Sequence, residues 1–225
     1  MTRGPSANHA RVWAVLTVPV AVPLSMTVLF SMLAKRMSPR SAYNIGFIVY
    51  WVGWCGLFSF WVLGWRRSIH LYSAGEKVSW VERALLALPV VGGAVTQVLP
   101  HRRDIDTRVA ATMLVAAAVN APLEEMLWRG VFLEIFPDNV VLGAVWPLVG
   151  FSIWHLAPQL ILPSRLGKAR FTAGAATVGA VSAFTVWRRR RLRPVLWSHL
   201  ATDAMGVTAA RFRLGLDTRP RADRQ

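Results

Sequence analysis

The chain has 225 residues, of which 54% are hydrophobic and only 16% are charged, whereas a soluble domain carries about 25% charged residues. The charged residues form short clusters between long apolar runs, a pattern that excludes an ordinary soluble domain and indicates a polytopic membrane protein. The net charge of +15 comes mainly from arginines in these clusters. They favour anionic lipid head groups, rather than nucleic acid, as partners. The single cysteine, Cys55, excludes an internal disulfide and a Cys-rich metal site.

The N-terminal hundred residues contain three predicted spans. Residues 12–34 form a run of 23 residues without a charge, and two prolines inside this run are expected to bend it. Residues 41–65 form the second span. The third span, residues 84–100, has only 17 residues and contains a proline and a Gly-Gly pair. We therefore expect it to be short, tilted or broken.

Four further spans are predicted in the second half of the chain, at residues 109–133, 139–157, 171–187 and 194–210. We thus expect an all-α, polytopic transmembrane helix bundle with about seven spans, or eight if a loop enters the membrane. Residues 1–225 would form one integral membrane domain that ends in a basic, mobile tail at residues 211–225. The bias toward arginine over lysine points to a bacterial cell membrane as its location.

The fourth predicted span carries three ionisable residues at membrane depth. Glu124, Glu125 and Arg129 lie within six residues of one another, in a run that is otherwise apolar. Such residues are costly inside a bilayer and usually serve a function. Glu125 and Arg129 are four residues apart and can pair on one helical face, whereas Glu124 points about 100° away. Arg129 would then neutralise one carboxylate and leave the other available for chemistry.

Two later spans add further ionisable groups. His155 is the only readily titratable residue between positions 139 and 164, and His199 and Asp203 lie four residues apart in the last span. Because lipid does not tolerate isolated ionisable groups, we expect these residues to converge with the glutamates. A glutamate and a histidine can deprotonate a water, and a second histidine can stabilise an oxyanion. The set predicts peptide hydrolysis by an activated water.

Other catalytic chemistries have weaker support in the sequence. There is no G-x-S-x-G nucleophile elbow and no H-E-x-x-H zinc signature, which argues against a covalent serine route and a typical zinc protease. We therefore expect no cofactor. Glu124, His155, His199 and Asp203 would nevertheless suit a divalent metal such as zinc or manganese, and this alternative stays open.

Three short motifs occur in order along the chain. Residues 124–129 read EEMLWR, residues 151–155 read FSIWH, and residues 199–203 read HLATD. They match the EExxxR, FxxxH and HxxxN/D motifs, so the chain resembles the CPBP intramembrane proteases, which include the CAAX prenyl endopeptidases and the Abi proteins. The resemblance covers roughly residues 109–210, which would be the catalytic core spans.

The resemblance implies an intramembrane glutamic endopeptidase acting on a membrane-associated peptide or protein. Glu124 and His155 would activate the water, His199 and Asp203 would stabilise the oxyanion, and Glu125 and Arg129 would support them. Well-studied members carry asparagine where this chain has Asp203. Because a charged carboxylate would repel an oxyanion, we expect Asp203 to be protonated or to orient His199.

Three other functions remain open on the sequence alone. A proton-coupled transporter also uses glutamate, aspartate and histidine along its path. A b-type haem protein could use His155 and His199 as axial ligands. A non-catalytic membrane scaffold or immunity protein could keep the same residues for structure.

Overall fold

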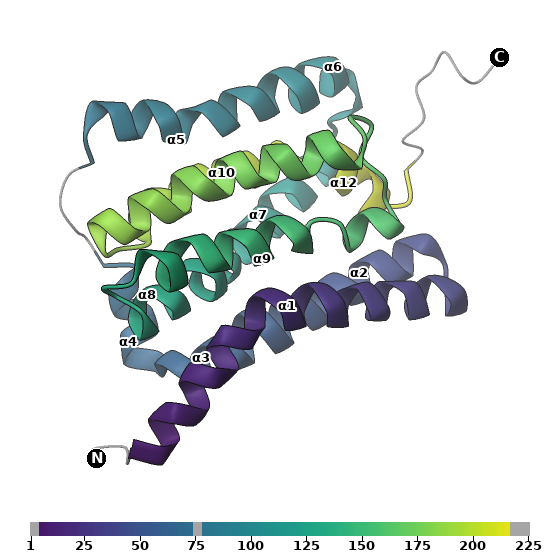
Figure 1. The fold of residues 1–225 in the computed structure, drawn as a ribbon. Coiled ribbons are helices and arrows are strands. Elements are labelled where there is room, and N and C mark those ends of the chain that lie inside the picture. Colours follow the sequence, from purple (N-terminus) through teal and green to yellow (C-terminus); the bar gives the residue numbers. More distant parts are fainter. Residues whose placement is uncertain (1–4, 74–77, 217–225) are drawn as a thin grey trace.

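The computed structural model describes residues 5–73 and 78–216, and within these residues it contains helices and turns but no strand. The predicted all-α class is confirmed. The long helices lie side by side: α5 lies along one edge of the bundle, α1 and α2 lie along the opposite edge, and α7, α9 and α10 lie between them (Figure 1).

The helices of the first half are α1 (Pro5–Arg36), α2 (Pro39–Val49), η1 (Tyr50–Phe58), α3 (Ser59–Leu63), α4 (Trp65–Leu71), α5 (Trp80–Gly93), η2 (Ala94–Val98), α6 (Leu99–His101) and η3 (Arg102–Asp104). The helices of the second half are α7 (Thr107–Glu125), η4 (Met126–Gly130), α8 (Val131–Ile135), η5 (Val141–Val145), α9 (Trp146–Trp154), η6 (Pro158–Leu160), α10 (Lys168–Arg189), α11 (Arg193–Asp203) and α12 (Val207–Arg213). The segments η1, η2, η4 and η5 are π-helical, and η3 and η6 are 3₁₀ turns.

Several of these helices run into one another and form longer continuous rods. In the described part of the chain, five are long and apolar enough to cross a membrane: His9–Arg36, Pro39–Leu63, Trp80–Asp104, Thr107–Ile135 and Val141–Leu160. Large apolar side chains such as those of Trp13, Leu24 and Phe184 are exposed on the outside of the bundle, as lipid contact requires. The predicted count of seven spans remains a prediction.

The third predicted span is neither short nor broken. It is continuous from Trp80 to Asp104 because Ser79 starts the helix early with a capping box: its hydroxyl accepts from the Glu82 N–H and its own N–H donates to the Glu82 carboxylate. The helix passes Pro89 and continues through the wider turns of η2.

The last predicted span, residues 194–210, is not a single helix. It is divided at residues 204–206, where α11 ends at Asp203 and α12 begins after Gly206. The predicted start of the mobile tail, at residue 211, is also too early, because Arg211 and Arg213 belong to α12. Arg213 stacks over the rings of Tyr43 and Phe47. Residues 217–225 of that tail lie outside the described residues.

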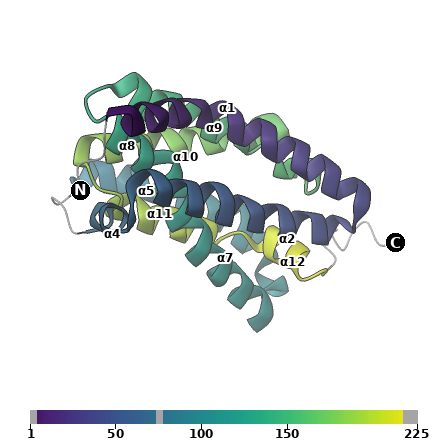
Figure 2. The same cartoon turned by 90° about the horizontal axis from the view of Figure 1, so that it is seen from below.

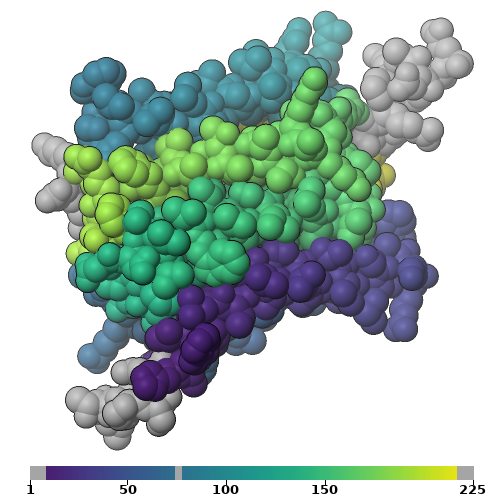
Figure 3. Space-filling view, viewed as in Figure 1, coloured from purple at the N-terminus to yellow at the C-terminus, as the bar shows by residue number. Residues whose placement is uncertain are grey.

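Two glycines allow α9 to pack closely between α1 and α10. A Cβ on Gly150 would lie 2.4 Å from Cα of Pro19 in α1, and a Cβ on Gly179 of α10 would lie 2.8 Å from the Leu148 side chain of α9. The first contact is with backbone, which cannot give way. α9 is therefore enclosed on two sides, and α1, α9 and α10 lie side by side on the face of the molecule seen in Figure 3.

The described residues include a buried ion pair that joins α5 to α10. The Arg189 Nε donates to Oε1 of Glu82 at 3.0 Å, and Glu82 is only 7% exposed. We expect Glu82→Gln to lower the free energy of unfolding in mild detergent by about 3 kcal/mol, because removing one charge of a largely buried ion pair is strongly destabilising.

Glu134→Gln is the matched control for this prediction. Glu134 pairs with Arg67 at 2.6 Å, but the two side chains are 30% and 46% exposed. Loss of so accessible a pair should cost less than about 1 kcal/mol. Equal losses of stability in the two variants would show that the Glu82–Arg189 pair does not hold the helices together.

Candidate active site

The EExxxR segment lies where α7 changes into a π-helical turn. Glu124 and Glu125 are the last two residues of α7, and Arg129 lies in η4. All seven residues from Glu124 to Gly130 are buried, so the three ionisable side chains face the protein and not the lipid. The Tyr72 hydroxyl donates to the Pro122 carbonyl just before the widened turn. Such π-helical insertions are frequent at functional sites.

Glu125 binds both Arg129 and His199. The Arg129 Nη1 lies 3.3 Å from Oε1 of Glu125, which is the pairing that the spacing of four residues predicts. The same oxygen lies 2.7 Å from Nδ1 of His199. Because a carboxylate only accepts hydrogen bonds, Nδ1 of His199 carries the proton and donates it. The guanidinium of Arg129 also stacks 4.2 Å above the ring of Phe151, from the FxxxH motif.

His199 stands at the centre of the cluster. Its Nε2 lies 3.5 Å from Oε2 of Glu124 and 3.5 Å from Oδ2 of Asp203. The contact arises because α11 packs along α7, as Figure 2 shows from below. The EExxxR and HxxxD motifs, about 75 residues apart in sequence, therefore meet at one imidazole ring.

Glu124 is held at one oxygen by a tryptophan. The Trp154 Nε1 donates to Oε1 of Glu124 at 3.0 Å, and the Trp154 ring stacks on Tyr50 with centroids 3.9 Å apart. The stacked ring fixes the direction of the indole N–H. Oε2 of Glu124 is consequently the oxygen that faces His199, and its position is set by a residue next to the FxxxH histidine.

His155 lies at the end of α9, close to the cluster. Its Nδ1 donates to the Phe151 carbonyl at 2.7 Å, an arrangement that leaves the lone pair on Nε2 and makes that nitrogen an acceptor. Within the described residues no hydrogen bond or ion pair joins His155 to Glu124, although the two are near enough to interact electrostatically. The ring of Phe151 lies 4.5 Å from that of His155 and below the guanidinium of Arg129, so it lies between His155 and the Glu125–Arg129 pair.

Asp203 is bound by a residue outside the three motifs. The Nδ2 of Asn120 donates to Oδ2 of Asp203 at 2.8 Å, and the Nε1 of Trp51 donates to Oδ1 of Asn120 at 2.6 Å. The side chain of Asp203 is 26% exposed, whereas that of Glu124 is 3% exposed. Asp203 is thus the acidic residue of the cluster that is most accessible from outside.

The positions of the carboxylates and histidines bear on the metal and haem alternatives. Among the residues that the structure describes, no group of three or more His, Cys, Asp or Glu side chains is placed to hold a metal ion. Both ring nitrogens of His199 lie against carboxylates, which disfavours this histidine as an axial haem ligand.

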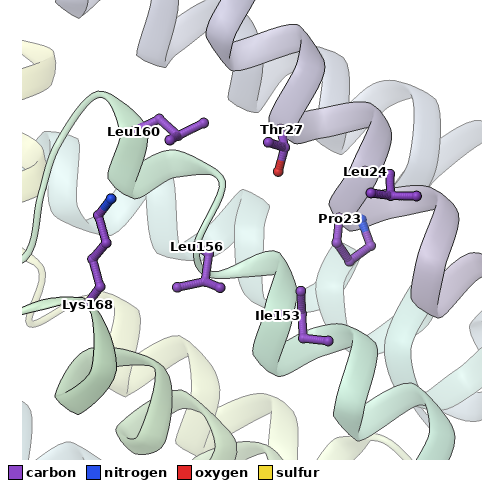
Figure 4. Close-up of a pocket in the computed structure, with 7 residues that line it drawn as sticks. All are labelled: Pro23, Leu24, Thr27, Ile153, Leu156, Leu160 and Lys168. Carbon is purple, nitrogen blue, oxygen red and sulfur yellow. The ribbon is translucent and has the colours of Figure 1, made fainter.

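A groove of about 290 Å³ opens next to the turn that carries His155 (Figure 4). Its walls come from α1, from the end of α9 with η6, and from the start of α10. Figure 4 shows these lining residues: Pro23, Leu24, Thr27, Ile153, Leu156, Leu160 and Lys168. The groove is mainly apolar, and its lining includes none of the six predicted site residues.

Sequence reasoning missed two residues that contact the cluster, Trp154 and Asn120, and a third, Trp51, that binds Asn120. Trp154 is best explained on sequence alone by packing, yet it binds Glu124. Asn120 belongs to none of the three motifs, although its position four residues before Glu124 puts both on one face of α7. Nothing in the sequence marks Trp51. In contrast, Trp128 of the EExxxR segment is buried against Tyr50, whose hydroxyl accepts its N–H.

The fold and the cluster together define a helical membrane protein with carboxylates and histidines buried at the junction of three helical segments. Residues 106–205 match the family model described as type II CAAX prenyl endopeptidase Rce1-like. The resemblance to the CPBP and CAAX protease family is confirmed over this stretch, which contains all six predicted site residues and supports a peptide hydrolase. Neither a curated protein nor a solved structure gives a significant match.

Proposed function

We propose that the protein is an intramembrane endopeptidase that hydrolyses a peptide bond with a water activated by Glu124. The observation that carries this proposal is the buried contact between Glu124 and His199, at 3.5 Å, inside the region that matches a protease family. A carboxylate and an imidazole without access to lipid, brought together from separate helices, are suited to moving a proton.

In this mechanism Glu124 is the general base. Trp154 occupies Oε1 of Glu124, so Oε2 would take the proton from the attacking water. His155 would accept a second hydrogen bond from the same water through Nε2, because the Phe151 carbonyl already holds Nδ1. The water would bridge Glu124 and His155, which explains why the two side chains do not need to touch each other.

His199 and Asp203 would stabilise the oxyanion that forms when the water attacks. Glu125 accepts the Nδ1 proton of His199, and Arg129 balances the charge of Glu125. These contacts orient the ring so that Nε2 points toward Glu124 and Asp203. Glu125 and Arg129 would therefore act through His199.

The neighbouring carboxylates support a protonated Asp203. Glu124, Glu125 and Asp203 all lie against the ring of His199, and like charges close together disfavour the ionised form of a carboxyl group. Asp203 could then donate to the oxyanion as an asparagine amide would.

The proposal is metal-free, and its substrate is a membrane-associated peptide or protein in a bacterial cell membrane. The five long apolar helices and the family match support the membrane location and the peptide substrate. No feature of the described site favours a transporter. A scaffold or immunity protein differs from an enzyme in one testable respect, because it would not need Glu124 as a base.

The test is a comparison of membrane peptides from three bacterial strains: the parent, a deletion strain, and the deletion strain carrying Glu124→Gln. We expect at least one membrane-associated peptide to remain uncleaved in both mutant strains and to be cleaved in the parent. Identical peptide termini in all three strains would contradict an endopeptidase. A phenotype of the deletion that Glu124→Gln fully rescues would favour a scaffold.

A further inference from the structure

We infer that Asn120 is a positioning residue for Asp203, and that Trp51 locks the Asn120 amide in the orientation this requires. The inference rests on the proposed function, since it assigns a purpose to the carboxyl oxygens of Asp203. Asn120 belongs to none of the three motifs, yet it lies on the same helix as Glu124 and reaches across to α11.

The orientation of the Asn120 amide follows from the chemistry of its two neighbours. An indole N–H is only a donor, so the group that Trp51 approaches at 2.6 Å must be the carbonyl oxygen of Asn120. The NH₂ group must then face Oδ2 of Asp203, at 2.8 Å. The reversed amide would place two donors against each other at Trp51 and two acceptors against each other at an ionised Asp203.

This orientation distinguishes the two oxygens of Asp203. Oδ2 accepts from Asn120 and also faces Nε2 of His199 at 3.5 Å. A proton on Asp203 is consequently favoured on Oδ1, where it can be donated to a substrate. Because the amide donates to the carboxyl group, it also stabilises the ionised form, and so it limits how high in pH the proton persists.

Five titratable or charged groups face Asp203 from the surrounding helices. They are Glu124 and Glu125 of α7, His199 of α11, Tyr43 of α2 and Arg213 of α12. None of the five contacts is made by Asn120. The guanidinium of Arg213 also lies 5.3 Å from the ring of Trp51, so the Trp51 variant must keep an aromatic ring there. A change in the proton affinity of Asp203 in Asn120→Leu can therefore be assigned to the loss of the amide donor.

The test follows the protonated carboxyl group of Asp203 by infrared spectroscopy in proteoliposomes, with no substrate present. The carboxyl band is assigned by its absence in Asp203→Asn. We expect Asn120→Leu to move the midpoint of its pH titration upward by about one unit, because a hydrogen bond to the charged form is lost. Thr112→Val, on the same helix, removes only a hydroxyl bonded to the Arg108 carbonyl and should move nothing.

A second variant protects the test from a folding defect. Trp51→Phe leaves Asn120 in place but frees its amide to rotate, so we expect a smaller upward shift of the midpoint. An unchanged midpoint in Asn120→Leu, or in Trp51→Phe if Asn120→Leu does not fold, overturns the inference. So does the absence of any titrating band that depends on Asp203.

The activity of the same variants separates this inference from the proposed function. With a lipid-anchored peptide library as substrate, Asn120→Leu should cleave up to a higher pH than the parent does. The same substitution added to Asp203→Asn should leave the pH limit of cleavage unchanged. A shift of the infrared midpoint in Asn120→Leu, without any peptide cleavage by the parent, would support the inference and contradict the proposed function. Cleavage that depends on Glu124, without a shift of the midpoint, would support the proposed function and contradict the inference.

Discussion

Glu124→Gln is expected to abolish peptide cleavage while the protein remains folded and inserted in the membrane. Glutamine has nearly the same shape and can still accept the Trp154 N–H at its carbonyl oxygen, but it cannot take a proton from water. General base catalysis is typically worth about 10²- to 10⁴-fold in rate, so kcat should fall by at least about 10²-fold. The measurement is cleavage of a lipid-anchored, quenched-fluorescence peptide library in proteoliposomes.

Glu134→Gln serves as the control, because it makes the same chemical change at a partly exposed ion pair in α8. It should cleave at the parental rate. If Glu124→Gln keeps its activity, the base is Glu125 or the reaction does not use a glutamate. The thermal unfolding of both variants in detergent shows whether a loss of activity reflects chemistry or folding.

Asp203→Asn is expected to keep its activity and to extend it to higher pH. A protonated Asp203 loses its donor when the pH rises through the point at which the carboxyl ionises, and activity should then decline. Asparagine has an amide N–H at every pH, so the alkaline decline should be weaker or absent. The pH dependence of kcat/KM for the parent and the variant measures this difference.

A metal mechanism predicts the opposite behaviour for the same variant. Asparagine is a poorer ligand for zinc than a carboxylate, so activity should fall in Asp203→Asn and excess zinc should partly restore it. Both proteins are therefore assayed with and without a chelator. Chelator-sensitive activity in the parent would overturn the metal-free account.

The type of fold and the meeting of His199 with the acidic residues could be predicted from the sequence because lipid imposes strict conditions. An apolar run of sufficient length predicts a helix, and ionisable residues within such runs must find partners. The contacts of His199 with Glu124, Glu125 and Asp203 follow from this requirement. The i, i+4 pairing of Glu125 with Arg129 could likewise be predicted, even though a π-helical turn lies between them.

Contacts that depend on how the helices rotate against one another could not be predicted. The hydrogen bond from Trp51 to Asn120 joins residues 69 positions apart, and that from Trp154 to Glu124 joins residues 30 positions apart. No local pattern indicates either one. Helix ends were also poorly predicted, because the Ser79 capping box lengthens one helix and the turn before Gly206 divides another.

The central claim is that water, activated by Glu124, attacks the peptide bond directly. This claim is tested by a single turnover of the wild-type protein in ¹⁸O-labelled water. The enzyme is in excess over an intact peptide that it is able to cleave. We expect one labelled oxygen in the new carboxyl terminus of the product and no label in the peptide of the enzyme that contains Glu124. An unlabelled product, or label in that segment of the enzyme, would show that a side chain attacks first and would contradict the mechanism.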